Sequence, residues 1–138
     1  MNRPPACLLL SQQDWQTILA HARTAEPREA VGLLGGTADG QVTQVAPLPN
    51  MASRGAFFAD PRAQYEAERG FSRLGLIPLA AYHSHPGGTA TLSAPDQRLA
   101  NRSLLQLVLA IGGDGSIDVR VYRVTDAVEQ VELEIKAD

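Results

Sequence analysis

The chain has 138 residues, of which 44% are hydrophobic and 20% are charged, and its formal net charge is −3. This length suits a single hydrophobic core, so we expect residues 1–138 to form one domain. The negative charge argues against a nucleic-acid or membrane-surface partner, because each would need a basic stripe. No apolar run reaches the roughly 18 residues of a membrane span.

Redox chemistry and export are not indicated at the start of the chain. The single cysteine, Cys7, has no partner for an internal disulfide, and in a predicted edge strand at residues 6–10 it is most simply a packing residue. Residues 1–5 lack the apolar stretch of a signal peptide. We therefore expect a cytoplasmic protein.

The next segment predicts an amphipathic helix. Ser11 is a plausible N-cap, and apolar residues recur at helical spacing to about Thr24, namely Trp15, Ile18, Leu19 and Ala22. The face formed by these residues is expected to pack on a sheet. His21 is expected at the surface or its boundary, since nothing near it in the sequence completes a set of metal ligands.

Strands dominate the following stretch. Pro27 ends the helix, and an apolar strand is predicted at residues 29–35 with a hairpin partner at residues 41–46. A short strand at residues 55–59 and a helix from its N-cap Asp60 through Arg73 come next.

Two histidines follow an apolar run of strand length. Residues 76–82 predict a buried strand, and His83 and His85 fall at its end. Side chains at positions i and i+2 of a strand share one face, about 6.6 Å apart. Both imidazoles can therefore reach one ion. A His-x-His pair alone is weak evidence for a metal, because such residues can equally be stacking or turn residues.

A third ligand candidate lies just beyond a flexible turn. Gly87 and Gly88 allow the chain to fold back, and Ser93 and Asp96 open a helical-looking segment that continues to residue 102. Helix capping alone would explain a Ser-x-x-Asp sequence, and capping does not exclude ligation. Two neutral nitrogens and a carboxylate would leave one tetrahedral position of Zn²⁺ open, which is typical of a catalytic zinc rather than a structural one.

The C-terminal third completes the predicted sheet. Residues 104–111 are almost wholly apolar, as in a central strand, while residues 117–124 and 128–135 alternate, as in strands with one wet face. The predicted fold class is α+β, a mixed and strongly bent β-sheet flanked by helices.

The central motif resembles that of the JAMM (MPN+) metalloprotease family, whose pattern is His-x-His-Pro, six residues, then Ser-x-x-Asp. This sequence fits it at His83, His85, Pro86, Ser93 and Asp96. The family also has an upstream glutamate in a Glu-x-x-Gly-Leu-Leu strand.

The upstream element is similar as well. Glu29 begins a segment that continues through Gly32, Leu33 and Leu34, and residues 47–50 (Pro-Leu-Pro-Asn) follow the next strand. The similarity covers residues 7–124. Leu92 departs from it, since many members carry proline before the serine, but no ligand is lost.

The resemblance implies a prokaryotic single-domain JAMM/MPN protein with a cytidine-deaminase-like fold. It implies Zn²⁺ held by His83, His85 and Asp96. Glu29 would be the general base that deprotonates the attacking water, and Ser93 would hydrogen-bond the developing oxyanion.

The same resemblance implies a substrate. Family members hydrolyse peptide or isopeptide bonds after the Gly-Gly tail of ubiquitin-like proteins, and similar compact bacterial members are associated with sulfur carriers. We expect a zinc metallopeptidase whose partner is such a tail, added as a strand beside the site. A zinc amidohydrolase acting on a small peptide-like metabolite and a non-catalytic MPN scaffold are the alternatives, and a homodimer is left open.

Overall fold

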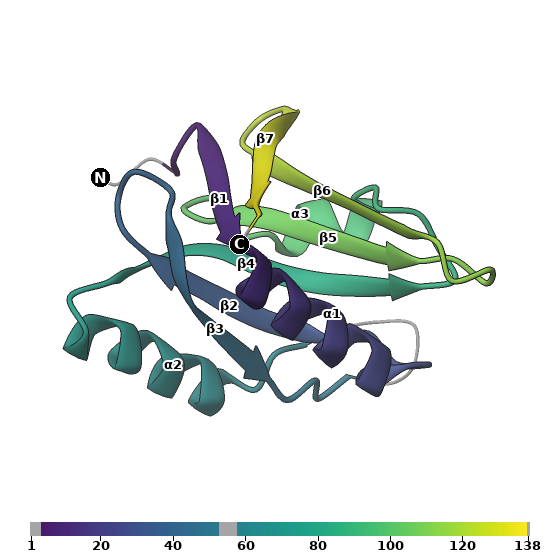
Figure 1. Ribbon diagram of the computed structural model, residues 1–138, viewed down its shortest axis with the longest axis horizontal. Coiled ribbons are helices and arrows are strands. Elements are labelled where there is room, and N and C mark those ends of the chain that lie inside the picture. The colour runs from purple at the N-terminus through teal and green to yellow at the C-terminus, as the bar shows by residue number, and fades with distance from the viewer. Residues whose placement is uncertain (1–3, 53–57, 138) are drawn as a thin grey trace.

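The computed structural model describes residues 4–52 and 58–137. Within these residues the chain forms three helices and one seven-stranded sheet with the order β1-β7-β6-β5-β4-β2-β3 (Figure 1). The strands are β1 (Cys7–Ser11), β2 (Val31–Gly36), β3 (Val42–Leu48), β4 (Ile77–Pro86), β5 (Leu105–Ile111), β6 (Ile117–Val124) and β7 (Val128–Lys136). The helices are α1 (Gln12–Ala25), α2 (Pro61–Arg73) and α3 (Ala94–Leu99). The predicted α+β class is confirmed.

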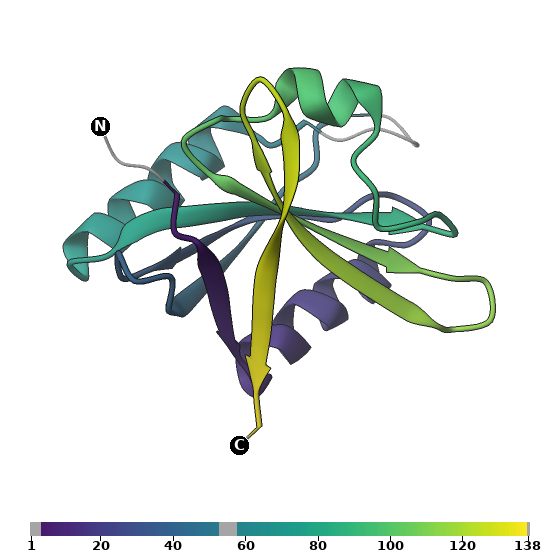
Figure 2. The ribbon, with the colours of Figure 1, turned by 90° about the horizontal axis from the view of Figure 1, so that it is seen from above.

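The sheet is mixed and strongly curved. Strands β4 and β5 are parallel, as are β1 and β7, and the other neighbouring strands are antiparallel. The two edges of the sheet meet where the Leu9 N–H of β1 donates to the Gly40 carbonyl at 2.9 Å, beside β3. Figure 2 shows the resulting fan of strands, with α1 on one side of the sheet and α2 and α3 on the other. The predicted bend is therefore present.

Helix α1 covers the face that holds the larger core. Its N-terminus is capped as predicted, because the Ser11 hydroxyl accepts the Asp14 N–H at 3.0 Å. The four apolar residues predicted for its inner face are all buried, and they pack against strand residues such as Leu34, Leu107 and Leu109. Each such leucine contributes about 1.5–3 kcal/mol through burial.

The opposite face carries two smaller apolar clusters. Phe71 of α2 packs over Gly35 of β2, where a Cβ atom would lie 2.6 Å from the phenyl ring. The second cluster consists of Ala90, Val108, Ala110 and Tyr122. A polar site therefore fits on this face, between α2 and the second cluster. None of the helices in the described ranges is long and apolar enough to span a membrane.

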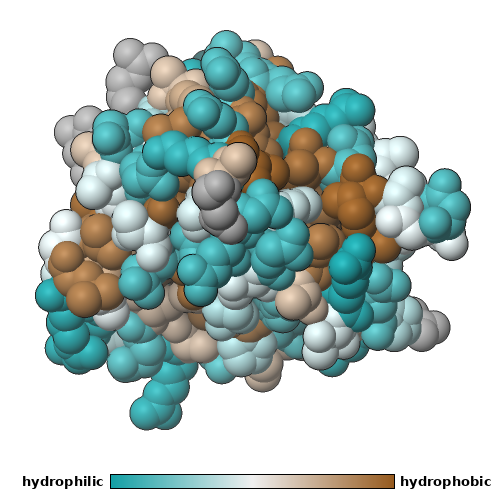
Figure 3. Space-filling view, viewed as in Figure 1, coloured by the Kyte–Doolittle hydropathy of each residue, from teal (hydrophilic) through white to brown (hydrophobic). Residues whose placement is uncertain are grey.

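The exposed surface is mixed in character. On the face seen in Figure 1, hydrophilic side chains surround several separate apolar patches (Figure 3). Large apolar side chains that remain exposed include Met51, Phe58 and Leu99.

Several element boundaries differ from those predicted; for example, β4 continues to Pro86 instead of ending at residue 82. Strand β2 begins at Val31 rather than residue 29, because its pairing with β4 starts at Val31 opposite His83. Helix α3 ends at Leu99 rather than residue 102, since Ala100 is extended. The strand predicted at residues 55–59 falls mostly outside the described residues. Ala59, which is described, forms only an isolated bridge with Asn50.

Candidate metal centre

Strand β4 places the two histidines on a rigid, buried element. It lies between β2 and β5, and successive side chains point to opposite faces. Tyr82 packs in the core beneath α1, whereas His83 and His85 point to the side of α3. His83 is 1% exposed and His85 is half-buried. Paired strands on both sides of His83 fix its backbone, which favours a site of defined geometry.

Helix α3 brings the carboxylate to the histidines. Its N-terminus is a capping box: the Ser93 hydroxyl accepts the Asp96 N–H at 3.1 Å, and Asp96 Oδ2 accepts the Ser93 N–H at 3.0 Å. Asp96 is 8% exposed. The cap therefore fixes the carboxylate in the direction of His83 and His85.

Three potential ligand atoms form a small triangle. His83 Nε2 lies 3.1 Å from His85 Nε2 and 3.1 Å from Asp96 Oδ2, and His85 Nε2 lies 3.2 Å from the same oxygen. Tetrahedral ligands about 2.0–2.1 Å from a zinc ion are roughly 3.3 Å apart. The triangle is therefore close to the size that one face of a zinc tetrahedron requires, and these residues fit the ion.

The tautomer of His85 suits ligation. Its Nδ1 lies 2.7 Å from the Thr89 carbonyl oxygen, and a carbonyl can only accept, so Nδ1 carries the proton. In the neutral ring Nε2 then presents its lone pair to the triangle. A backbone carbonyl holding the far nitrogen is the usual support for a metal-binding histidine.

The electrostatics keep the carboxylate anionic. Burial raises the pKa of Asp96, but its close contacts with the rings of His83 and His85 outweigh burial and hold that pKa well below its usual range. Hydrogen bonding to Asp96 in turn raises the pKa of His85. A cation bound among the three residues would therefore compete with protons for the His85 ring.

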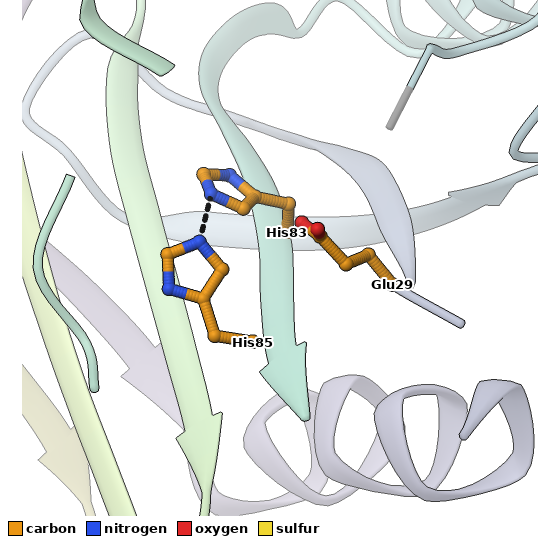
Figure 4. A group of neighbouring side chains, drawn as sticks. All are labelled: Glu29, His83 and His85. Atoms are coloured by element: carbon orange, nitrogen blue, oxygen red, sulfur yellow. Dashed lines mark hydrogen bonds between the residues drawn. The ribbon is translucent and has the colours of Figure 1, made fainter. Parts of the chain in front are cut away.

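Glu29 lies beside this triangle, just before β2. One ligand-type atom of Glu29, His83 and His85 each lies within 4.8 Å of those of the other two (Figure 4). The Glu29 Oε1 atom is buried and has no hydrogen-bond partner among the described residues. Burial raises the pKa of Glu29, and the two histidines oppose this effect. The Glu29 carboxylate therefore lies close to both histidines with one oxygen atom unpaired among the described residues.

Two side chains hold the backbone of this acid. Asn50 Nδ2 donates to the Glu29 carbonyl at 2.9 Å, and the Ala30 N–H donates to Ser84 Oγ at 2.8 Å. The Ser84 N–H also donates to the Ala30 carbonyl at 3.0 Å. Glu29 is therefore fixed at a strand start although it makes no ladder hydrogen bond of its own.

Sequence reasoning missed these supporting residues. The sequence does not indicate the role of Ser84, because a serine between two histidines need not make any specific contact. Asn50 belongs to the family-like segment at residues 47–50, but the sequence alone does not indicate what it contacts. Thr89 acts through its backbone carbonyl, which no sequence pattern marks.

Four of the five predicted site residues converge, and Ser93 lies apart from them at the start of α3. His83, His85, Asp96 and Glu29 converge, whereas Ser93 is exposed and its hydroxyl oxygen accepts the capping hydrogen bond. Its hydroxyl proton is not used by that cap, so capping and donation to a ligand remain compatible.

The third histidine lies across the sheet from this group. His21 is half-buried on α1, at the boundary predicted for it, and its Nδ1 lies 2.6 Å from the Tyr82 hydroxyl. Burial lowers the pKa of His21. Cys7 is half-buried in β1, as its role in packing predicts.

Comparisons with known proteins point to the same family. The profile described as prokaryotic homologs of the JAB domain matches residues 11–126. A probable TtuB-protein conjugate cleaving protease of Thermus thermophilus is 38% identical over 68% of this chain and 64% of its own length. A desampylase of Haloferax volcanii is 32% identical over 68% of this chain and 73% of its own. A CysO-cysteine peptidase of Mycobacterium tuberculosis is 30% identical over 79% and 77%, respectively. The chain therefore spans slightly less than two thirds of the Thermus relative.

Solved structures share the fold. A protein of Desulfitobacterium hafniense, 35% identical, superposes with a TM-score of 0.86 over 95% of this chain and 94% of its own. A JAB1/MPN domain protein from Archaeoglobus fulgidus, 23% identical, gives a TM-score of 0.66 over 95% and 99%, respectively. The family profile matches most of the chain, and the fold agrees with it, as do the Glu29 and His-x-His elements. The chain therefore belongs to the prokaryotic JAB domain family.

Proposed function

We propose that this protein is a zinc-dependent metallopeptidase that hydrolyses the peptide or isopeptide bond after the C-terminal tail of a ubiquitin-like, sulfur-carrier type protein. The observation that carries the proposal is the triangle of His83 Nε2, His85 Nε2 and Asp96 Oδ2 with the Glu29 carboxylate beside it. The names of the three relatives support this substrate class, since they describe a TtuB-protein conjugate cleaving protease, a desampylase and a CysO-cysteine peptidase.

In this proposal His83, His85 and Asp96 hold the metal. When bound, zinc supplies Lewis acidity to the reacting water and carbonyl. Glu29 is assigned as the base rather than a ligand because Asp96 Oδ2 already completes the triangle with the two histidines, while Glu29 Oε1 has no hydrogen-bond partner among the described residues. It takes a proton from the attacking water and returns it to the leaving amine, so that water and one amide yield an acid and an amine.

Ser93 is proposed as the donor to the oxyanion that forms on the attacked carbonyl. Its hydroxyl oxygen already accepts the Asp96 N–H, so the Ser93 proton is free to point elsewhere. Because Ser93 and Asp96 share one cap, the donor has a fixed position relative to the proposed ligand.

An apolar cleft beside the site supports an extended protein tail as the substrate. The cleft has a volume of about 250 Å³ and begins at Val31, the strand partner of His83. It extends to Leu99, at the end of the helix that carries Asp96. Its other apolar lining includes Leu33, Leu48, Phe58 and Leu104. A small metabolite would leave this apolar surface uncovered, whereas apolar residues of a tail would bury it.

The test is a cleavage assay with zinc-loaded protein. The substrate is a ubiquitin-fold carrier extended beyond its Gly-Gly terminus by one residue, and the comparison substrate is a short peptide with the same last four residues. We expect cleavage after the second glycine, with a higher kcat/KM for the carrier. Equal or better hydrolysis of the short peptide would favour the amidohydrolase. No hydrolysis of either substrate by metal-loaded protein would favour the scaffold.

A further inference from the structure

The segment between β4 and α3 is fastened to the sheet at its middle. It comprises residues 87–92, which form neither helix nor strand. Gly87 has a φ of 69°, a left-handed conformation that favours glycine, and its N–H donates to the Ile111 carbonyl at 2.7 Å. Ala90 is fully buried against Val108 and Ala110 of β5 and the ring of Tyr122 of β6.

Tyr122 makes a specific polar contact with this segment. Its hydroxyl donates to the Ala90 carbonyl oxygen at 2.7 Å, in a buried setting. Since a carbonyl oxygen can only accept, the proton of the Tyr122 hydroxyl points to Ala90.

The residue next to Ala90 makes the contact that orients His85. The Thr89 carbonyl accepts the His85 Nδ1 proton at 2.7 Å. Two successive carbonyls of one short segment are thus occupied, one by Tyr122 and the other by His85. A rotation of the peptide groups that broke the first hydrogen bond would also misalign the second.

We infer that Tyr122 is a positioning residue for the metal centre: by holding the Ala90 carbonyl it fixes the Thr89 carbonyl, which holds His85 in the tautomer whose Nε2 is free to bind a metal. The inference rests on the proposed function only for the identity of His85 as a ligand. Within the described part of the chain, the Tyr122 hydroxyl bonds to Ala90 and to none of the proposed ligands, and Tyr122 belongs to a strand two places away from β4. Loss of a hydrogen-bonding partner behind a ligand typically weakens metal binding 10–100-fold.

A second tyrosine provides a matched control. Tyr82 is also buried in a strand and also uses its hydroxyl in one hydrogen bond, to His21 at 2.6 Å, but on the opposite face of the sheet. Tyr122→Phe and Tyr82→Phe therefore remove the same group from comparable surroundings. A general loss of stability would affect both variants, whereas the positioning role belongs to Tyr122 alone.

The first measurement needs no metal. Long-range ¹⁵N–¹H spectra of the metal-free protein, recorded at a pH where the His85 ring is neutral, give the population of each tautomer. We expect His85 to carry its proton on Nδ1 in the wild type and in Tyr82→Phe. In Tyr122→Phe, we expect a mixture of tautomers because the Thr89 carbonyl is no longer held.

The second measurement is the zinc dissociation constant, determined by competition with a chelator. We expect Tyr122→Phe to bind zinc about tenfold more weakly than the wild type and Tyr82→Phe to bind it within twofold. An unchanged His85 tautomer in Tyr122→Phe, or an equal loss of affinity in both variants, would overturn the inference. If the wild type holds no zinc, the proposed function fails, while the tautomer spectra still decide whether Tyr122 positions His85.

Discussion

The two faces of β4 use polar side chains in opposite ways. On the α1 side, the Tyr82 hydroxyl and the Ser84 hydroxyl each find a neutral partner, His21 Nδ1 and the Ala30 N–H. On the α3 side, the side chains of His83 and His85 converge with a carboxylate. Four consecutive residues thus serve two purposes, because alternation along a strand separates them.

The difference lies in how the hydrogen-bonding atoms are matched. Across the α1 face, each donor meets one acceptor, which stabilises the fold by about 1 kcal/mol per hydrogen bond. Across the other face, the Nε2 atoms of His83 and His85 and one oxygen of Asp96 lie within 3.2 Å of one another, and the His85 Nδ1 proton points away from them to Thr89. Such a cluster is costly for folding alone and favourable around a cation. One face therefore supports structure and the other is suited to chemistry.

Removing a proposed ligand should have the largest effect. His83→Ala and His85→Ala should each abolish zinc binding and hydrolysis together, because two remaining ligands cannot hold the ion tightly. Metal analysis and the carrier cleavage assay on the same preparation check this. Activity that survived without bound metal would show that the α3 face is not a metal centre.

Glu29→Gln should leave zinc binding intact and impair hydrolysis. The amide keeps the shape of the side chain but cannot take a proton, so we expect normal zinc content and a loss of kcat of about 10²–10⁴-fold. Zinc content and single-turnover rates are the measurements. A metal-free Glu29→Gln variant would instead make Glu29 a ligand, as its proximity to both histidines allows.

Ser93→Ala tests the residue that the structure shows as a cap. If Ser93 also donates to the oxyanion, kcat should fall about a hundredfold or more with zinc retained. The loss of the cap should in addition lower the free energy of unfolding by about 1 kcal/mol. A lowered melting temperature with unchanged kcat would restrict Ser93 to its structural role.

Zinc affinity should depend on pH with a defined sign. The pKa of His85 is raised, so below that pKa a proton must leave the ring before a metal can bind. Affinity should therefore fall by about tenfold per pH unit as the pH drops below the His85 pKa. Chelator competition between pH 6 and 8 measures the slope, and an affinity independent of pH would argue against His85 as a ligand.

Tyr82→Phe should have the smallest effect on activity, because it changes only the α1 face of β4. It removes the hydroxyl that bonds His21, so the free energy of unfolding should fall by about 1 kcal/mol. Because this hydrogen bond lies on the α1 face, kcat and KM should stay within twofold of the wild type. A large loss of activity with normal stability would show that the two faces are coupled.

A feature of this site can be predicted from the sequence when the residues that form it are close together in the chain. Alternation along β4 and the spacing of Ser93 and Asp96 are local, and they were sufficient to predict which side chains would meet. The role of Glu29 came from resemblance, because nothing within its own segment indicates that β2 starts beside His83.

Long-range pairings account for what sequence reasoning left out. The contact between Asn50 and the Glu29 carbonyl joins residues 21 positions apart, and that between Tyr122 and Ala90 joins residues 32 positions apart. The curvature that joins β1 to Gly40 was expected as a bend, but its particular partners depend on sheet register. Every residue has a backbone carbonyl, so the sequence cannot show that the Thr89 carbonyl is the one that accepts from His85.

The most direct test is a crystal structure of the zinc-loaded protein, with anomalous data collected on both sides of the zinc absorption edge. We predict one anomalous peak per chain, about 2.0 Å from His83 Nε2, His85 Nε2 and Asp96 Oδ2, with Glu29 near the ion but not bound to it. A peak that included Glu29 and left out Asp96 would contradict the assignment of ligand and base. The absence of any peak between these residues would contradict the metal centre itself.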